Sequence, residues 1–262
     1  MLGPLVAEVR GEGPTVVLLH GNGEDARLFD GIVDYLTGFR VVTLEARGHG
    51  RTPVGPQPLT IAHLAKDVAA AIGEGEARGV MDGKVFVVGF SDGANVAMEL
   101  AIHRLPRVRG LVLIGGNCRP SGMKVAVHIA IVVIWAALAL ASLVSTGARR
   151  RARVWGLMVG QPRITDADLA RIDVPTLVVA GERDVVARRH TERTAQVIRG
   201  ADMVIVPGRG HMLPTEAPEV LGPAIASFLN AEARSGNLGG QGHPGAATGP
   251  TWDHPDHSED SS

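Results

Sequence analysis

A serine, an aspartate and a histidine in this 262-residue sequence have the order and surroundings that nucleophilic catalysis needs. Ser91 stands in a G-x-S-x-G pattern, from Gly89 to Gly93, between an apolar run and a helical pattern that begins at Asp92. A serine on a sharp strand-to-helix turn exposes its hydroxyl at a sheet edge, and the two glycines leave room for the crowded backbone. A glycine-rich turn with an incidental serine would match the same pattern. The strand-to-helix context therefore makes Ser91 the candidate nucleophile.

A nucleophilic serine needs a base to take its proton and an acid to orient that base. Asp184 and His211 each follow an apolar run of strand length. Because the carboxyl ends of parallel strands meet at one edge of a sheet, we expect both side chains beside Ser91. Glu182 is a rival acid, and we prefer Asp184 because it lies further into its loop. We predict a triad of Ser91 as nucleophile, His211 as base and Asp184 as orienting acid.

Acyl transfer also needs N–H groups aimed at the developing oxyanion. The turn His20-Gly21-Asn22-Gly23 follows an apolar run, and we predict that the backbone N–H groups of Asn22 and Asp92 form the oxyanion hole. His20 is interpreted as a support of this turn rather than as a catalytic group. The Asp92 carboxylate either attracts a cationic substrate group or simply lies favourably at a helix N-terminus, and we prefer the second interpretation.

Strand-length apolar runs alternate with helical patterns, which predicts parallel strands joined by helical crossovers. The central runs are apolar throughout, as expected for strands covered on both faces. The fold class is therefore α/β, with a mostly parallel central sheet and helices on both faces. We expect strands at Leu5–Val9, Thr15–Leu19, Arg40–Leu44, Lys84–Gly89, Val108–Ile114, Thr176–Ala180 and Asp202–Val206. We expect helices at Asp25–Leu36, Thr60–Glu76, Asp92–Leu105, His190–Ile198 and Ala217–Asn230, with Asp25 and Thr60 as N-caps.

Two segments interrupt this alternation. Residues 121–171 separate two expected strands by more than one crossover helix requires, which predicts an inserted helical cap. Residues 231–262 are rich in glycine and polar residues without periodicity, which predicts a disordered tail. The core is then formed by residues 1–120 and 172–230.

The overall composition excludes several classes of protein. With 26 Lys+Arg against 27 Asp+Glu, the net charge of -1 gives no general attraction to nucleic acid. The single cysteine, Cys118, excludes an intramolecular disulfide and a cysteine-cluster metal site, and it fits a reducing cytoplasm. The first residues lack the pattern of a secretory signal peptide. We expect a cytoplasmic protein that needs no cofactor and no metal; the oligomeric state stays open.

The stretch from Val125 to Val144 is almost entirely apolar, and as a helix it would be about 30 Å long, enough to span a bilayer. Such a span would put Ser91 and His211 on opposite sides of the membrane, so the triad could not assemble. We therefore predict a cap helix, or broken helices, with residues such as Ile131 and Ile134 lining an acyl pocket. Whether this cap is simply buried or also makes peripheral contact with a membrane stays open.

Taken together, these motifs resemble the α/β-hydrolase fold family, with serine esterases and lipases among its members. The resemblance covers residues 5–230 apart from the insertion, and it rests on the segments 19–23, 45–52, 89–93, 175–184 and 210–211. Glu45 stands where the family usually has Asp in its Asp-x-Arg-Gly-His-Gly run, which we interpret as a structural turn. In the turn that carries the candidate nucleophile, the sequence Ser91-Asp92-Gly93 is similar to that of small esterases.

The expected function is that of a serine hydrolase cleaving a small-molecule ester or thioester with an apolar acyl group, through an acyl-enzyme. Two alternatives stay open. The same triad could support C–C bond hydrolysis or perhydrolysis, and the fold could instead serve a non-catalytic ligand-binding protein.

Overall fold

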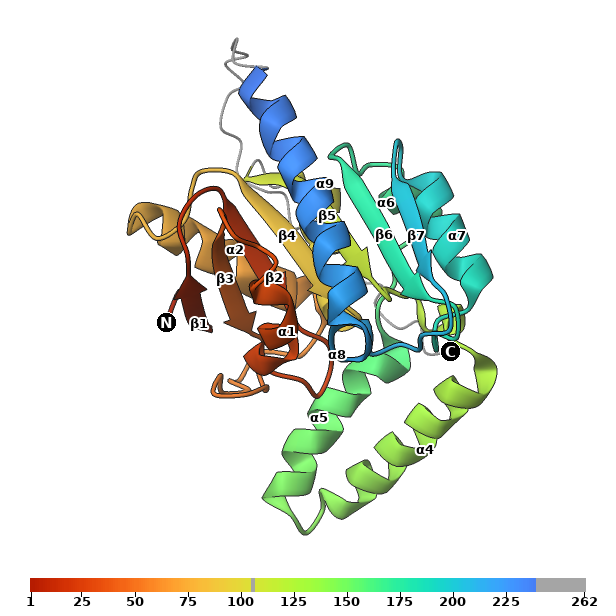
Figure 1. Cartoon of the computed structure of the whole chain (residues 1–262). Coiled ribbons are helices and arrows are strands. Elements are labelled where there is room, and N and C mark those ends of the chain that lie inside the picture. Colours follow the sequence, from red (N-terminus) through yellow and green to blue (C-terminus); the bar gives the residue numbers. More distant parts are fainter. Residues whose placement is uncertain (105–106, 239–262) are drawn as a thin grey trace.

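A seven-stranded sheet forms the centre of the computed structural model, which describes residues 1–104 and 107–238 (Figure 1). The strand order is β1-β3-β2-β4-β5-β6-β7. Only β1 runs antiparallel to its neighbour, and the other pairs are parallel. The strands are β1 (Val6–Arg10), β2 (Thr15–Leu19), β3 (Arg40–Glu45), β4 (Val85–Phe90), β5 (Val108–Ile114), β6 (Thr176–Gly181) and β7 (Asp202–Val206). The predicted fold class is confirmed, and each strand agrees with its expected range to within a residue at either end.

Helices cover both faces of the sheet because the central strands are apolar on both sides. Successive residues of β4 alternate between two buried clusters: Val87 packs with one and Val88 with the other. The first cluster lies under α2 (Ile61–Ala77), α3 (Asp92–Ile102) and α7 (Arg188–Val197). The second lies under η1 (Ala26–Phe29), α1 (Asp30–Val33), α8 (Leu213–Glu216) and α9 (Pro218–Leu238).

The predicted N-caps are confirmed. The Thr60 hydroxyl accepts the His63 N–H at the start of α2, and the Asp25 carboxylate accepts the Arg27 N–H at the start of η1. The single helix expected over Asp25–Leu36 is wrong, however, because the buried Phe29 has backbone angles of φ -98° and ψ 4° that separate η1 from α1.

Helix α9 continues past Asn230 to Leu238, so residues 231–238 are not the disordered tail that the sequence predicted. Tertiary contacts explain the extension. The Arg109 guanidinium donates to the carbonyl oxygens of Glu232 and Ala233, at 3.3 and 3.4 Å, and Ala233 packs against the second buried cluster. The rest of the predicted tail, residues 239–262, lies outside the described residues, as does Leu105, the last residue of the helix expected from Asp92.

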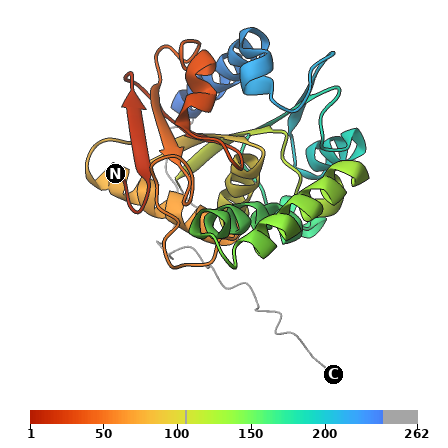
Figure 2. The ribbon, with the colours of Figure 1, turned by 90° about the horizontal axis from the view of Figure 1, so that it is seen from below.

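Between β5 and β6 the chain forms η2 (Pro120–Gly122), α4 (Val125–Ala141), α5 (Thr146–Gly160) and α6 (Asp166–Leu169). Helices α4 and α5 are packed against each other as a hairpin that extends below the sheet in Figure 1 and lies across one side of the molecule in Figure 2. We call residues 125–160 the α4–α5 hairpin. Over residues 1–104 and 107–238, no helix combines the length and the apolar character needed to cross a membrane.

We predict that Arg109→Met lowers the free energy of unfolding by about 1–3 kcal/mol, because it removes the donor for two α9 carbonyls and a cation 4.6 Å from the centre of the Phe86 ring. Urea unfolding monitored by circular dichroism measures the change. Arg199→Met, at an exposed arginine, is the control and should stay within about 0.5 kcal/mol of the parent protein. Equal effects of the two substitutions would contradict the anchoring of α9 by Arg109.

Candidate active site

Strands β4, β6 and β7 end at the same edge of the sheet, and one predicted triad residue follows each of them. Ser91 comes directly after β4, Asp184 lies in the loop after β6, and His211 lies in the loop after β7. Because these strands are parallel and β4 is separated from β6 only by β5, the sheet brings together side chains up to 120 residues apart in sequence.

Ser91 lies on a sharp turn whose backbone is in a conformation that side chains rarely adopt, with φ 54° and ψ -116°. Its N–H donates to the Ile114 carbonyl oxygen at 2.7 Å. Close backbone packing explains the flanking glycines. A Cβ at Gly89 would overlap the Gly93 carbonyl, and one at Gly93 would overlap the Leu19 carbonyl of β2. The turn therefore requires glycine at both positions.

The three predicted residues form a continuous hydrogen-bonded chain. His211 Nε2 lies 3.1 Å from Ser91 Oγ, and His211 Nδ1 lies 2.8 Å from Asp184 Oδ1. Asp184 is 2% exposed, and its Oδ1 also accepts the Val186 N–H at 2.9 Å. Because a carboxylate can only accept, Nδ1 carries the proton and Nε2 is left to accept one from the serine.

The rival acid, Glu182, has a different role. Its Oε2 accepts the Gly208 N–H at 2.8 Å and so holds the turn that follows β7. Cys118 is a poor rival nucleophile, because burial raises the pKa of its thiol to about 11.

Gly115 is a site residue that the sequence analysis missed. It follows β5 with φ +61°, and a Cβ there would lie 2.9 Å from His211 Cε1 and 3.3 Å from Asp184 Oδ2. The ring of Phe90 lies against the other part of the imidazole, with centroids 4.9 Å apart. Gly115 thus makes room for the histidine, and its one sequence signal was its place at the end of an apolar strand.

The two predicted oxyanion residues, Asn22 and Asp92, are joined to each other by a hydrogen bond, and Asn22 lines the same cavity as Ser91. Asn22 Nδ2 donates to Asp92 Oδ2 at 3.1 Å and to the Val154 carbonyl of α5 at 2.9 Å. Asp92 is the first residue of α3, where a backbone N–H has no partner within the helix. Its other oxygen accepts Asn95 Nδ2 at 3.2 Å, and burial raises the pKa of its carboxyl. These contacts favour the structural interpretation of the Asp92 side chain.

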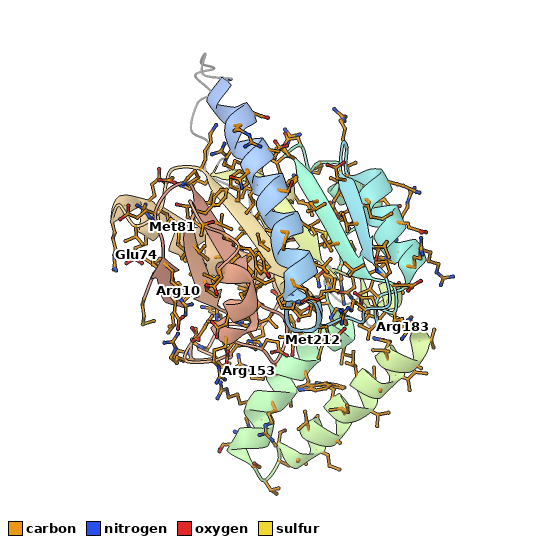
Figure 3. The ribbon with its side chains drawn as sticks, viewed as in Figure 1. Arg10, Glu74, Met81, Arg153, Arg183 and Met212 are labelled. Atoms are coloured by element: carbon orange, nitrogen blue, oxygen red, sulfur yellow. The ribbon has the colours of Figure 1, made fainter. Side chains whose placement is uncertain are left out.

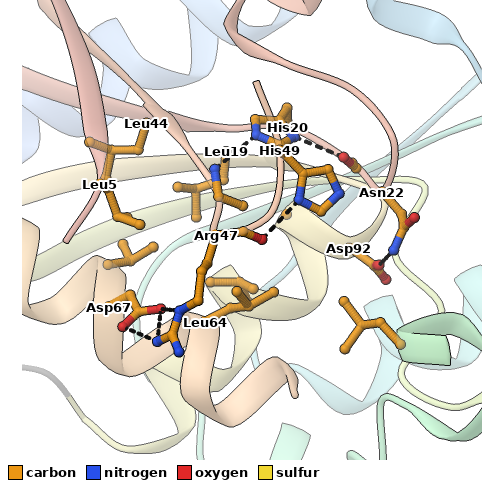
Figure 4. Close-up of a pocket in the computed structure, with 16 residues that line it drawn as sticks. Leu5, Leu19, His20, Asn22, Leu44, Arg47, His49, Leu64, Asp67 and Asp92 are labelled. Carbon is orange, nitrogen blue, oxygen red and sulfur yellow. Dashed lines mark hydrogen bonds and ion pairs between the residues drawn. The ribbon is translucent and has the colours of Figure 1, made fainter. Parts of the chain in front are cut away.

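A small cavity of about 20 Å³ beside the Asn22 turn is lined partly by buried polar residues (Figure 4). His20 Nδ1 lies 2.8 Å from the Gly21 carbonyl oxygen, and its Nε2 accepts the Ala46 N–H at 2.9 Å. Burial lowers the pKa of His20, so the ring is neutral and both nitrogens hold backbone groups. His20 thus supports the turn, as its structural interpretation requires.

Two charged pairs stabilise the segment next to this cavity. Arg47 donates to the Asp67 carboxylate in a buried ion pair, with Nε 2.9 Å from Oδ2. Glu45 accepts the Arg51 N–H at 2.7 Å and lies so close to Gly50 that a Cβ there would meet its carboxylate at 2.6 Å. Glu45 therefore closes a structural turn, as the resemblance implied.

A cavity of about 260 Å³ opens over Ser91 and His211. Its wall is largely apolar, and the α4–α5 hairpin contributes Val127, Ile131, Trp155 and Met158. Ile131 is 8% exposed, whereas Ile134 is 41% exposed and lies outside this wall. The expectation that Ile134 lines the pocket is wrong, because α4 turns that side of the helix toward solvent. Within the described residues, no group of three or more His, Cys, Asp or Glu could hold a metal ion.

Comparisons with known proteins show the family of this chain. A family model described as the alpha/beta hydrolase family matches residues 16–224. A putative carbamate hydrolase, RutD, of Caulobacter sp. (strain K31) is 28% identical over 253 residues, covering 84% of this chain and 91% of its own. The crystal structure of a hydrolase from Pseudomonas aeruginosa has a TM-score of 0.68 at 28% identity, covering 86% of this chain and 94% of that one. The chain therefore belongs to the alpha/beta hydrolase family.

Other relatives match over shorter parts. A probable oxidoreductase, EphD, of Mycobacterium tuberculosis is 48% identical over 67 residues, which is 24% of this chain and 11% of the relative's length. A pimeloyl-[acyl-carrier protein] methyl ester esterase of Methylococcus capsulatus is 35% identical over 116 residues, covering 44% of this chain and 42% of the esterase. The present chain thus spans only a small part of the mycobacterial relative.

Because His49 is buried, we predict that the free energy of unfolding decreases in acid. Burial, followed by the nearby His20 and Arg150, lowers the pKa of His49 from 6.5 to about 4. The unfolded chain therefore takes up a proton near pH 6.5 that the folded chain takes up only near pH 4, so stability falls as the pH drops between these values. At about 1.4 kcal/mol per pKa unit, this histidine accounts for a loss of up to about 3 kcal/mol.

Urea unfolding at pH 7 and pH 4.5 measures this loss. His49→Gln should reduce the difference between the two pH values, because glutamine does not titrate. His63→Gln, at a partly buried histidine of α2, is the control and should keep the full difference. An undiminished pH dependence in His49→Gln would show that other groups cause the loss.

Proposed function

We propose that the protein is a serine hydrolase that cleaves an ester or thioester with an apolar acyl group. The observation that carries this proposal is the chain from Ser91 Oγ to His211 Nε2 and from His211 Nδ1 to Asp184, at the floor of a largely apolar cavity. A hydroxyl, a neutral imidazole and a carboxylate in this order are the groups that nucleophilic acyl transfer needs.

In the first half of the reaction, Ser91 Oγ attacks the substrate carbonyl carbon while His211 Nε2 takes the hydroxyl proton. The imidazolium is stabilised by Asp184 and then gives the proton to the leaving alcohol or thiol as its bond to the carbonyl carbon breaks. In the second half, His211 takes a proton from water, and the hydroxide attacks the acyl-enzyme. The bond between Ser91 Oγ and the carbonyl carbon then breaks, and His211 returns its proton to Oγ. The carboxylic acid is released, and the enzyme is back in its starting state.

The negative oxygen that forms on the carbonyl would be held by the backbone N–H groups of Asn22 and Asp92. The Asn22 side chain supports this role, because its bonds to the Asp92 carboxylate and to the Val154 carbonyl keep the turn in place beside Ser91. Donors that are already positioned need no reorganisation when charge develops on the oxygen.

The cavity wall indicates the acyl part of the substrate. Val127, Ile131, Trp155 and Met158 offer apolar surface to a chain that leads away from Ser91, and each buried methylene adds about 0.8 kcal/mol to binding. The methyl ester esterase and the carbamate hydrolase among the relatives act on carbonyl compounds by their names, in agreement with this substrate class. The location in the cytoplasm stays a prediction.

We predict that Ser91→Ala abolishes labelling by a fluorophosphonate probe and lowers ester hydrolysis by about 10³-fold or more, because the triad acts as a unit. Gel-based labelling and a p-nitrophenyl ester assay measure the two effects. Ser121→Ala, at an exposed serine of η2, is the control and should behave like the parent protein. Absence of labelling in the parent protein would instead favour a ligand-binding role on this fold.

A second prediction concerns acyl chain length. Ile131→Asp should lower kcat/KM for octanoyl esters by tenfold or more relative to acetyl esters, because it puts a charge into the cavity wall. Ile134→Asp makes the same chemical change on the solvent side of the same helix and should preserve the preference of the parent protein for the longer ester. A panel of p-nitrophenyl esters from two to twelve carbons measures both variants. The same loss in both would show that this cavity does not hold the acyl chain.

A further inference from the structure

The α4–α5 hairpin exposes more large apolar side chains than its role in the cavity requires. Helix α4 contains no Asp, Glu, Lys or Arg, and only one side of it contributes to the cavity over Ser91. On the other side and in the turn after it, Val125 is 73%, Leu143 75% and Val144 92% exposed. Large exposed apolar patches of this kind mark interaction surfaces.

These side chains include the outermost part of the molecule. The turn between α4 and α5, at residues 142–145, lies at the end of the hairpin farthest from the sheet (Figure 1). Leu140 just before this turn and Leu143 and Val144 within it are exposed, and we call residues 140–145 the hairpin tip. Because the tip projects from the rest of the molecule, it can contact a partner surface while the sheet and the cavity wall stay in place.

The first turns of α5 add a strongly basic surface beside the tip. A groove of about 460 Å³ runs between α5 and the loop at residues 50–54, and Arg149, Arg150 and Arg153 line it (Figure 3 labels Arg153). The Arg149 guanidinium donates to the Ser142 carbonyl, Arg150 to that of Gly48, and Arg153 to those of Gly55 and Gln57.

These contacts position the arginines without neutralising their charge, because carbonyl oxygens carry no net charge. Arg151 lies in the same helical turns and is exposed as well. The sequence has no Asp or Glu between Glu99 and Asp166, so the hairpin itself supplies no counter-charge. Three arginines that line one groove, with Arg151 on another face of the same helix, therefore give an apolar tip a basic surrounding that complements anions next to hydrocarbon.

We propose that the hairpin tip and the α5 arginines dock the protein on the surface of a bilayer that contains anionic phospholipid. Leu140, Leu143 and Val144 would enter the boundary between headgroups and acyl chains, while the arginines meet headgroup phosphates. Neither feature crosses the bilayer, so the attachment is peripheral and reversible. This inference concerns binding alone and does not depend on the proposed hydrolase function.

The chemistry of the surface favours lipid over the other occupants. The last 24 residues of the chain, 239–262, contain four acidic residues that could meet the arginines, but their one large apolar side chain, Trp252, is too little to cover the tip. A second copy of the chain would bring the same positive charges toward the dimer axis, where they repel each other. An anionic bilayer satisfies both the apolar and the basic parts at once.

Flotation of the full-length chain with vesicles tests the proposal. We expect binding to phosphatidylcholine vesicles that contain phosphatidylglycerol, weaker binding to phosphatidylcholine alone, and a decrease as salt is raised. Leu143→Ser with Val144→Ser should lower the partition coefficient more than tenfold. Arg149→Gln with Arg151→Gln leaves the loop contacts of Arg150 and Arg153 intact and should lower it roughly 10- to 30-fold on the anionic vesicles.

Two matched double variants serve as controls. Val9→Ser with Val220→Ser removes two exposed apolar side chains elsewhere, and Arg189→Gln with Arg199→Gln removes two exposed arginines, so both should bind like the parent chain. Thermal unfolding verifies that every variant is folded. Failure of the folded parent chain to bind anionic vesicles overturns the proposal, as does equal weakening by the controls. A dimer that dissociates in the Leu143→Ser, Val144→Ser variant, without vesicle binding, would assign the tip to a second copy.

Discussion

The backbone around Ser91 packs so tightly against β2 and α3 that side chains are excluded at Gly89 and Gly93. This contact holds the serine at φ 54° and fixes where its hydroxyl lies relative to the sheet edge. The strain is maintained because the flanking strand and helix are both buried and cannot relax separately. Everything else at the candidate site depends on this position, since His211 reaches Ser91 only from the loop after β7.

Polar contacts also join the Ser91 turn to the turn at Asn22, because the Asn22 side chain donates to the Asp92 carboxylate. The Asn22 side-chain amide donates both to Asp92, the residue after the serine, and to the Val154 carbonyl of α5, so one amide links the Ser91 turn, the Asn22 turn and the α4–α5 hairpin. Behind it, His20 and His49 stay neutral because burial disfavours their charged forms. The buried His49 is the group that we expect to make the fold sensitive to acid.

The α4–α5 hairpin combines two environments on one apolar helix. One side of α4 forms cavity wall through Val127 and Ile131, and the other side is exposed to solvent together with the tip. The proposed docking surface lies at the far end of the hairpin, whereas the residues of α4 that line the cavity lie nearer its start, so the two proposed sites rest on different parts of the same hairpin.

The sequence by itself determined the strands, the α/β class and the order of Ser91, Asp184 and His211, because continuous apolar runs and a glycine-flanked serine are local patterns. Only the tertiary structure decided that Gly115 makes room for His211, that Arg109 extends α9 beyond Asn230, and which side of α4 faces the cavity. The first two depend on contacts between distant segments. The third could not be read from a helix that is apolar all round, since such a helix has no periodicity to mark its buried face.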